Sequence, residues 1–584
     1  MVKPLTVYRA SAGSGKTFAL AAQYIKLVVR NPQSYRNILA VTFTNKATEE
    51  MKTRILSQLY GIWKRLPDSQ VYTNAVCQSL DASPEFVSER AGIALNLLLH
   101  NYNHFRVMTI DTFFQSVFRN LARELDLPTN LRIGLNDVQV EEMAVDQMIQ
   151  ELKTTDVVLQ WIMKYIMENI SDDRTWNVIG QIKQFGKTIF QDCYKDISKQ
   201  LDERLGQEGF FDEYTRTLRG IRDDARERML SIAESFFSTL EEEGLTYEDL
   251  ANKKRGIASF FFKLRDGVFD ESIVNQTVAN CLEDPAKWYA KTHSRREVIH
   301  MLADGPLGDI LRYALDERPI QWKRFQSATL TLRHLNQVRL LSNIDNKIRS
   351  LNTEANRFLL SDTQKLLNEL ISDSDSPFIF EKIGTQLEHI MIDEFQDTST
   401  AQWQNFRVLL METMSHSGSE NLIVGDVKQS IYRWRNGDWR LLNDIEQQLP
   451  EGMIQTKPLN TNRRSERRII TFNNQFFTEA ARLEYDKLED QPEAVQLKRA
   501  YSEVEQVIPD DSPETGYVNI KLLTADDYQQ QTLAHVADTI EMLCQQGVSQ
   551  NKMAILVRTN SYIPIIANYF AEIEIGRASC RERA

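Results

Sequence analysis

Five short apolar runs stand out along the chain, and each has the length of a buried strand. A strand inside a parallel sheet is covered on both faces, so its sequence is apolar at successive positions and not only at alternate ones. The first run leads into a turn rich in glycine and serine and then into apolar residues at helical spacing, which end at Asn31 and Pro32. Strand, turn, helix and strand in this order are typical of a βαβ unit. The pattern therefore predicts an α/β fold with a parallel sheet, whose strands cover residues 5–8, 37–44, 105–111, 389–395 and 422–426.

The hydrophobic pattern changes between residues 121 and 375. Long amphipathic helical patterns, rich in Leu, Glu, Lys and Arg, replace the short apolar runs there. We interpret this stretch as a helical domain inserted into the first domain, which would comprise residues 1–120 and 376–455. Residues 456–573 would begin a further α/β domain. The strands expected in that domain cover residues 517–523 and 553–557.

The composition is that of an ordinary globular protein, with 42% hydrophobic and 26% charged residues. The net charge of −12 argues against a protein that coats nucleic acid with its whole surface, but it permits a local basic groove. Two local clusters of arginine fit such a groove: Arg433, Arg435 and Arg440, then Arg463, Arg464, Arg467 and Arg468.

Sequence features also bear on the compartment. No stretch reaches the roughly 18 apolar residues that a membrane span needs, and the start of the chain leaves no room for a signal peptide. The five cysteines form no CxxC pair, which favours reduced thiols. We therefore expect a cytoplasmic protein without a membrane partner.

The turn after the first predicted strand has the residue types of a phosphate-binding loop. Backbone N–H groups of such a loop point at the phosphates of a nucleotide, at a helix N-terminus that favours anions. Lys16 would neutralise phosphate charge, and Thr17 would ligate Mg²⁺. A Gly/Ser turn without a ligand is the plain alternative, but the place of this turn between a strand and a helix favours a nucleotide site. The candidate nucleotide-binding residues are Ala10, Ser11, Ala12, Gly13, Ser14, Gly15, Lys16 and Thr17.

An acid pair, Asp393 and Glu394, follows the fourth apolar run. Both carboxylates would emerge at the C-terminal end of a strand, where ligands bind in open α/β sheets. Asp393 can hold Mg²⁺ through water, and Glu394 can orient and deprotonate an attacking water. An acid pair at a strand end is usually solvated surface, but the phosphate loop gives this pair a functional reason.

The fifth apolar run leads into a segment that carries Gln429 and then Tyr432, Trp434 and Arg435. Aromatic and basic side chains suit a nucleic-acid strand because stacking accepts every base and contributes roughly 1–3 kcal/mol per base. For a Trp seen alone, core packing would be the better interpretation. Together the three motifs indicate a chain that couples nucleotide hydrolysis to the binding of a nucleic-acid strand.

The motifs, in this order, resemble those of superfamily 1 DNA helicases of the UvrD/Rep type. Residues 42–47 resemble motif Ia, 109–113 motif Ib, 393–398 motif II, 425–435 motif III and 462–465 motif IV. The sequence of the phosphate loop, together with the lack of a Gln-bearing adenine motif upstream, is more similar to the RecB/AddA branch of this family. That branch processes double-strand DNA ends in recombinational repair. The resemblance implies a P-loop NTPase fold, with a RecA-like domain that carries a large helical insertion and an incomplete second RecA-like domain.

By this resemblance the protein is an ATP-dependent 3′→5′ DNA helicase or translocase that uses Mg²⁺. Lys16 and Glu394 would act on the phosphates and the attacking water, and Gln429 would sense the γ-phosphate. Arg464 would be an arginine finger from the second motor domain. Arg463 stands where related helicases often place a Tyr that stacks on adenine, which puts the base selectivity of the site in doubt.

The resemblance also implies DNA contacts and partners. Trp434 would stack on a base, and further residues would contact single-stranded DNA. The implied partners are single-stranded DNA, duplex DNA ends and a partner nuclease or helicase subunit. The candidate DNA-binding residues are Phe43, Asn45, Thr112, Tyr432, Trp434 and Arg435.

Two later motifs of the family, V and VI, are not found in the 584 residues. Residues 575–583 match a translated sequencing adapter, since AGATCGGAAGAGCGTCGTGTAGGGAAAGAG read in one frame encodes them. We therefore expect a truncated gene with an artefactual tail at residues 574–584; a basic native terminus is the alternative. On this interpretation the fragment binds ATP weakly, unwinds nothing and exposes apolar surface, whereas its parent is a complete motor.

Two other function classes remain open. A protein that binds DNA ends as an accessory subunit, with an inert nucleotide site, is one, although an inert relative would be expected to have lost Lys16, Glu394 or Arg464. A phosphate-loop kinase is the other, and the aromatic segment around Trp434 argues against it, as does the lack of an acceptor-site signature.

Overall fold

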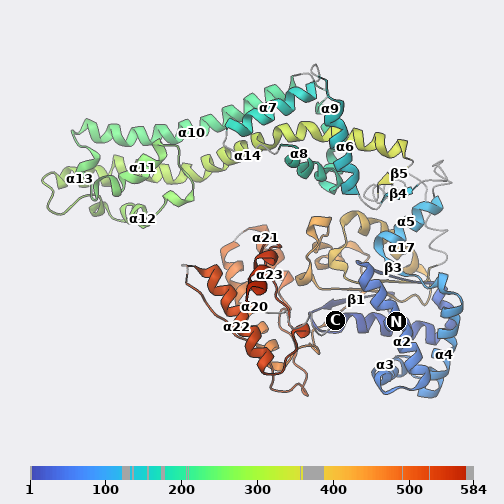
Figure 1. The fold of residues 1–584 in the computed structure, drawn as a ribbon. Coiled ribbons are helices and arrows are strands. Elements are labelled where there is room, and N and C mark those ends of the chain that lie inside the picture. The colour runs from blue at the N-terminus through green and yellow to red at the C-terminus, as the bar shows by residue number, and fades with distance from the viewer. Residues whose placement is uncertain are drawn as a thin grey trace. The chain divides into compact units, whose positions relative to one another are not determined.

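The computed structural model describes residues 3–121, 132–134, 137–153, 157–171, 178–205, 207, 209–355, 357–359, 387–488, 491–524 and 527–573 (Figure 1). The chain divides into two compact units. The first comprises Met1–Asn460 and Val495–Ser502, and the second Thr461–Ala494 and Glu503–Ala584. The expected tail at residues 574–584 lies outside the described residues.

Among the described helices, none combines the length and the apolar character that a membrane crossing requires.

A six-stranded parallel sheet with the order β3-β2-β6-β7-β1-β8 forms the centre of the first unit. All five predicted strands lie in it, which confirms the α/β class and the parallel sheet. Strands β6 and β7 come from far along the chain and insert between β2 and β1, so that Ile392 pairs with both Val41 and Ile423. The strands are β1 (Leu5–Ala10), β2 (Ile38–Thr42), β3 (Val107–Thr109), β6 (His389–Ile392), β7 (Asn421–Gly425) and β8 (Ile454–Leu459).

Successive residues of the central strands enter two different hydrophobic cores. Ala40 and Met391 pack into one core, whereas Val41 and Ile392 pack into the other. This alternation explains the continuous apolar runs, because side chains of a strand point to opposite faces and both faces are covered. One core includes residues of α1 (Lys16–Arg30), α2 (Asn45–Lys64), α3 (Gln70–Leu80) and α4 (Pro84–His100), and the other residues of α5 (Ile110–Leu121), α17 (Thr400–Ser415), α18 (Arg440–Asn443) and α19 (Ile445–Gln448).

The sixth strand, β8, was not predicted from the sequence. It lies at the edge of the sheet beside β1, alternates between partly buried and exposed residues, and contains Pro458. An edge strand tolerates proline because one side of its backbone needs no partner, and its exposure removes the apolar signal. The domain boundary that we predicted between residues 455 and 456 falls inside this strand.

The stretch between β3 and β6 is largely helical, as predicted. Helices α10 and α14 run side by side (Figure 1), and α14 extends over 49 residues with Pro319 inside it. A short parallel pair, β4 (Arg132–Gly134) and β5 (Arg357–Leu359), joins the two ends of the insertion. The helices are α6 (Asp137–Glu151), α7 (Val157–Ser171), α8 (Val178–Gly186), α9 (Asp192–Leu205), α10 (Phe210–Glu242), α11 (Ala258–Arg265), α12 (Gln276–Glu283), α13 (Arg296–Asp304) and α14 (Pro306–Glu354).

The strands expected at residues 517–523 and 553–557 are not formed, so this prediction was wrong. A strand exists only where its backbone groups pair with a neighbouring strand, and within the described residues neither segment belongs to a sheet. Most of their apolar side chains are exposed, Leu522 and Leu556 almost completely. The helices that follow β8 are α20 (Arg467–Leu488), α21 (Pro492–Ala500), α22 (Tyr528–Gln545) and α23 (Tyr562–Glu572).

Candidate nucleotide and nucleic-acid sites

The predicted phosphate loop joins the end of β1 to the first turn of α1. Gly13 and Gly15 have φ angles of 72° and 89°, which are strained for residues with a Cβ and bring the backbone into a tight turn. The loop is held from within, because the Ser14 hydroxyl donates to the Ser11 carbonyl oxygen over 2.7 Å and accepts from the Ser11 N–H over 3.3 Å. The first turn of α1 therefore presents N–H groups without helical partners to an anion at the loop.

Lys16, Glu394 and Gln429 meet although they come from three different strand ends. The Lys16 Nζ lies 2.6 Å from Glu394 Oε2 and 3.1 Å from Gln429 Oε1. The carboxylate and the amide oxygen accept hydrogen bonds of the kind that phosphate oxygens accept from an ammonium group. The structure thus brings together three of the four predicted catalytic residues.

Asp393 is buried at the end of β6, with 5% of its surface exposed. Its backbone N–H donates to the Val41 carbonyl oxygen, and its Oδ1 accepts from the Glu394 N–H over 3.0 Å. Burial raises the pKa of this carboxyl to about 7, the neighbouring Glu394 adds to the increase in pKa, and Lys16 opposes both effects. A buried carboxyl beside a second carboxylate suits a divalent cation, whose charge would favour the ionised form. Asp393, directly after β6, and Thr17, in the first turn of α1, are the two predicted Mg²⁺ ligands, and this role stays a prediction.

The orientation of the Gln429 amide is set by Asp426. The Gln429 Nε2 donates to Asp426 Oδ2 over 2.8 Å, and an amide that donates from its nitrogen there turns its oxygen toward Lys16. Asp426 is itself buried and lies 2.9 Å from the Lys428 Nζ. Asp426 lies within residues 425–435, which resemble motif III, but the sequence indicated no role for it. Its hydrogen bond to Gln429 in the folded protein identifies that role.

A groove of about 1070 Å³ collects all six predicted DNA-binding residues. The rings of Phe43 and Tyr432 lie 4.5 Å apart, and the Arg435 guanidinium lies 4.8 Å from the centre of the Trp434 ring. Trp434 is 67% exposed, which is unusual for a large aromatic ring and leaves much of the ring accessible to a ligand. Aromatic faces beside a cation are the physical requirements for binding bases without sequence preference.

The opposite wall of the groove comes from the helical insertion and was missed by sequence reasoning. Its residues include Val138 at the start of α6, and Gln184, Lys187 and Phe190 on and after α8. No motif marks these positions, because their spacing in the sequence is that of ordinary amphipathic helices. On the sheet side, Asp111 accepts a hydrogen bond of 3.0 Å from Gln402. These two residues also line the groove and had not been assigned a role.

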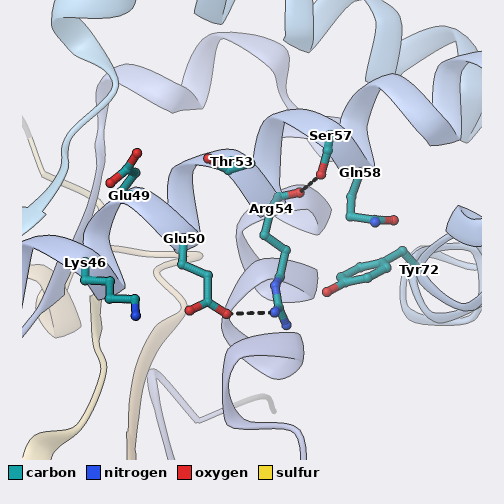
Figure 2. Close-up of a pocket in the computed structure, with 8 residues that line it drawn as sticks. All are labelled: Lys46, Glu49, Glu50, Thr53, Arg54, Ser57, Gln58 and Tyr72. Carbon is teal, nitrogen blue, oxygen red and sulfur yellow. Dashed lines mark hydrogen bonds and ion pairs between the residues drawn. The ribbon is translucent and has the colours of Figure 1, made fainter. Parts of the chain in front are cut away.

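A second hollow of about 650 Å³ lies along α2 and α3, lined by Lys46, Glu50, Arg54 and Tyr72 among others (Figure 2). Arg54 and Glu50, one turn apart on α2, form an ion pair of 3.0 Å at its edge. The Tyr72 ring packs 4.5 Å from the ring of Phe18, which directly follows the Mg²⁺-ligand candidate of the phosphate loop. The hollow therefore adjoins the start of α1 and was not predicted from the sequence.

Arg464, the predicted arginine finger, belongs to the second unit and is exposed there. Its loop is held by the buried Asn462, whose Oδ1 accepts from the N–H groups of Arg464 and Ser465 over 2.9 and 3.0 Å. The Asn462 Nδ2 donates to Gln506 over 2.8 Å. The second unit thus presents Arg464 on a fixed turn, and its role at a nucleotide remains a prediction.

The chain is similar to one known protein family and to several known proteins. The family model "UvrD/REP helicase N-terminal domain" matches residues 2–450. The A subunit of the ATP-dependent helicase/nuclease of Clostridium perfringens (strain SM101) is 24% identical over 532 residues, and its namesake of Staphylococcus haemolyticus is 22% identical over 519 residues. These matches cover 85% and 82% of this chain but 39% and 38% of the relatives.

The RecB subunit of the RecBCD enzyme of Borreliella burgdorferi is 24% identical over 454 residues, which are 74% of this chain and 34% of that protein. The chain therefore spans well under half the length of the curated relatives that it matches. Since the family model covers most of the 584 residues, the chain belongs to the UvrD/REP helicase family and contains its N-terminal domain.

Proposed function

We propose that the protein is an ATP-dependent DNA helicase or translocase that acts on single-stranded DNA at duplex ends in recombinational repair. The observation that carries this proposal is the presence of two candidate binding sites in one compact unit. The first is the group formed by Lys16, Glu394 and Gln429 at the phosphate loop. The second is the aromatic and basic groove that contains Tyr432 and Trp434.

In the proposed reaction the loop and Lys16 bind the β- and γ-phosphates of ATP. Mg²⁺ held by Thr17 and Asp393 would supply charge stabilisation at the phosphates when bound. Once Lys16 has moved to the phosphates, Glu394 is released from its 2.6 Å ion pair and is free to accept a proton from water. Gln429, oriented by its hydrogen bond to the carboxylate after β7, detects the γ-phosphate.

The DNA strand would lie in the groove, with its bases against the exposed aromatic rings. A motor that moves over any sequence needs contacts that do not depend on the base, and stacking supplies them. Lys187, on the insertion wall, would attract the phosphate backbone. The relatives bear the names of subunits, and we propose that this protein also works with a partner nuclease or helicase subunit.

The alternative function is an accessory protein at DNA ends with an inert nucleotide site, in which nucleotide binding would not depend on Lys16. We expect a fluorescent ATP analogue to bind the 584-residue chain in the presence of Mg²⁺. Lys16→Ala should weaken this binding roughly 10- to 150-fold, because charge-assisted hydrogen bonds contribute about 1.5–3 kcal/mol. The matched control is Lys26→Ala on the same helix, whose ammonium is paired with Glu420 away from the loop. Equal affinity of the Lys16 variant and the wild type would contradict the proposed site.

Direction and turnover are finer parts of the proposal. A 3′→5′ motor faces the duplex when it is loaded on a 3′ tail, so we expect a higher affinity for duplex DNA with a 3′ tail than with a 5′ tail; a reversed preference would overturn the direction. The sequence carries one candidate arginine finger, Arg464, and none of the later family motifs. We therefore expect these residues to bind ATP without sustained turnover, and brisk DNA-stimulated hydrolysis would refute that expectation.

A further inference from the structure

Gln396 is a buried side chain that lies between the candidate nucleotide site and the candidate nucleic-acid groove. Only 1% of its surface is exposed. Its Nε2 donates to Glu394 Oε2 over 2.8 Å and to Asp397 Oδ2 over 3.2 Å, while its Oε1 accepts from the Asp426 N–H over 2.9 Å. Both ends of the amide are thus used, and by groups that belong to two different motifs.

The segment after β6, which carries Gln396, packs closely against the end of β7. A Cβ on Gly425 would lie 2.7 Å from the Leu442 Cδ2 and 2.8 Å from the Gln396 Oε1, so a larger residue at the end of β7 would displace these side chains. The Gln396 carbonyl oxygen also accepts a hydrogen bond of 3.3 Å from the Ser430 hydroxyl. Gln396 therefore contacts the segment after β7 through its side chain and its backbone.

On the nucleotide side, Gln396 and Lys16 share one atom. Glu394 Oε2 accepts from Gln396 over 2.8 Å and from Lys16 over 2.6 Å. A phosphate that takes Lys16 away leaves this carboxylate oxygen with Gln396 as its remaining partner of the two. The position of Glu394, and with it that of the Gln396 amide, then depends on whether the loop is filled.

On the strand side, the bonds run into the aromatic segment. Asp426 begins the turn that carries Gln429, and Asp397 Oδ1 accepts from the Ile431 N–H over 3.4 Å. The next residue is Tyr432, whose ring packs against an aromatic ring of the groove. A shift of the buried amide therefore reaches the strand-binding rings through two backbone N–H groups.

We propose that Gln396 is a positioning residue that transmits the state of the nucleotide loop to the strand groove. It does not touch nucleotide or DNA; it holds Glu394 and the segment after β7 in one arrangement. This inference rests on the proposed function, since it requires both ligands to bind. Coupling of this kind typically changes the affinity for one ligand about 5- to 150-fold when the other binds.

The test measures the affinity of the 584-residue chain for a labelled oligo(dT) of about 16 nucleotides, the upper end of the site sizes of single-strand binders, with and without Mg²⁺ and the non-hydrolysable ATP analogue AMP-PNP. The wild type should show at least about a fivefold change in affinity between the two conditions. Gln396→Met keeps the volume but removes the donor and the acceptor, so each ligand alone should bind within about threefold of wild type and the change should fall below about twofold. The matched control is Gln321→Met, which removes another buried amide, from α14.

The outcomes separate the inference from the function on which it rests. Failure of the wild type to bind either ligand alone would refute the proposed function. Binding of both ligands without coupling, or full coupling in Gln396→Met, would overturn the role of Gln396 and leave the function in place. Because the variant can fail to fold, a second measurement uses the wild type alone. Hydrogen exchange of residues 426–437 should change when AMP-PNP binds without DNA, and unchanged exchange there would also overturn the inference.

Discussion

Glu141 on α6 offers a direct test of the physical reasoning. Its side chain is completely buried, and neither carboxylate oxygen has a hydrogen-bond partner within the described residues. A Cβ on Gly186 of α8 would lie 2.3 Å from its Oε1, so the carboxyl is pressed against that helix. A nearby cation has another partner, since Lys183 pairs with Asp146. Charge on this carboxyl is therefore poorly compensated.

Burial raises the pKa of Glu141 from 4.5 to about 7, with Lys187 and Lys183 opposing the shift and Glu142 and Asp146 adding to it. A raised carboxyl pKa means that the folded state binds the proton more tightly than the unfolded state. The stabilisation is fully present below about pH 4.5 and is lost as the pH rises to about 7. The shift corresponds to about 3 kcal/mol as an upper limit.

We expect Glu141→Gln to be more stable than the wild type at about pH 8.5, by up to about 3 kcal/mol, and to differ little from it below about pH 4.5. For the transition that includes α6 this corresponds to roughly 5–10 °C in Tm. Thermal unfolding followed by circular dichroism at several pH values measures both quantities. The control is Glu142→Gln, the half-exposed neighbour, which should change stability by less than about 0.5 kcal/mol. Equal pH dependence in Glu141→Gln and the wild type would refute the argument.

Three further predictions concern the sites. Trp434→Ala should weaken binding of oligo(dT), measured by fluorescence anisotropy, roughly 5- to 150-fold, because stacking on one base contributes about 1–3 kcal/mol; Trp63→Ala, outside the groove, should not. Chelation of Mg²⁺ should weaken ATP-analogue binding to the wild type, and Asp393→Asn should show little further loss on chelation; an equal response of both proteins would exclude Asp393 as a ligand. Asn462→Ala should destabilise the second unit by about 1–3 kcal/mol in urea unfolding, since it leaves N–H groups of the Arg464 turn unpaired; an unchanged midpoint would show that this turn does not depend on Asn462.

Local sequence carried much of the fold and of the candidate site. The apolar runs predicted five strands because both faces of the sheet are covered, and the glycines at Gly13 and Gly15 marked a turn with positive φ. The edge strand β8 could not be predicted, because its exposed positions are not apolar and leave no continuous apolar run. The strands expected at residues 517–523 and 553–557 failed for the opposite reason, since an apolar run forms a strand only where a neighbour pairs with it.

Residues whose importance depends on a partner far away in the chain could not be recognised in advance. Gln396 and Asp426 are ordinary polar residues in the sequence, and only the hydrogen bond between them, which joins two strand ends, distinguishes them. Lys187 and Phe190 lie on the groove only because the insertion packs against the sheet domain there. No residue pattern records such an approach.

The sequence by itself determined which chemical groups are present, in which order they occur, and which of them follow strands. Only the tertiary structure decided that β6 and β7 lie between β2 and β1, because strand order depends on pairing across hundreds of residues and not on local pattern. That order brings Lys16 within 2.6 Å of Glu394 and within 3.1 Å of Gln429. The motifs therefore predicted which side chains form the site, and the strand order of the sheet places them close together.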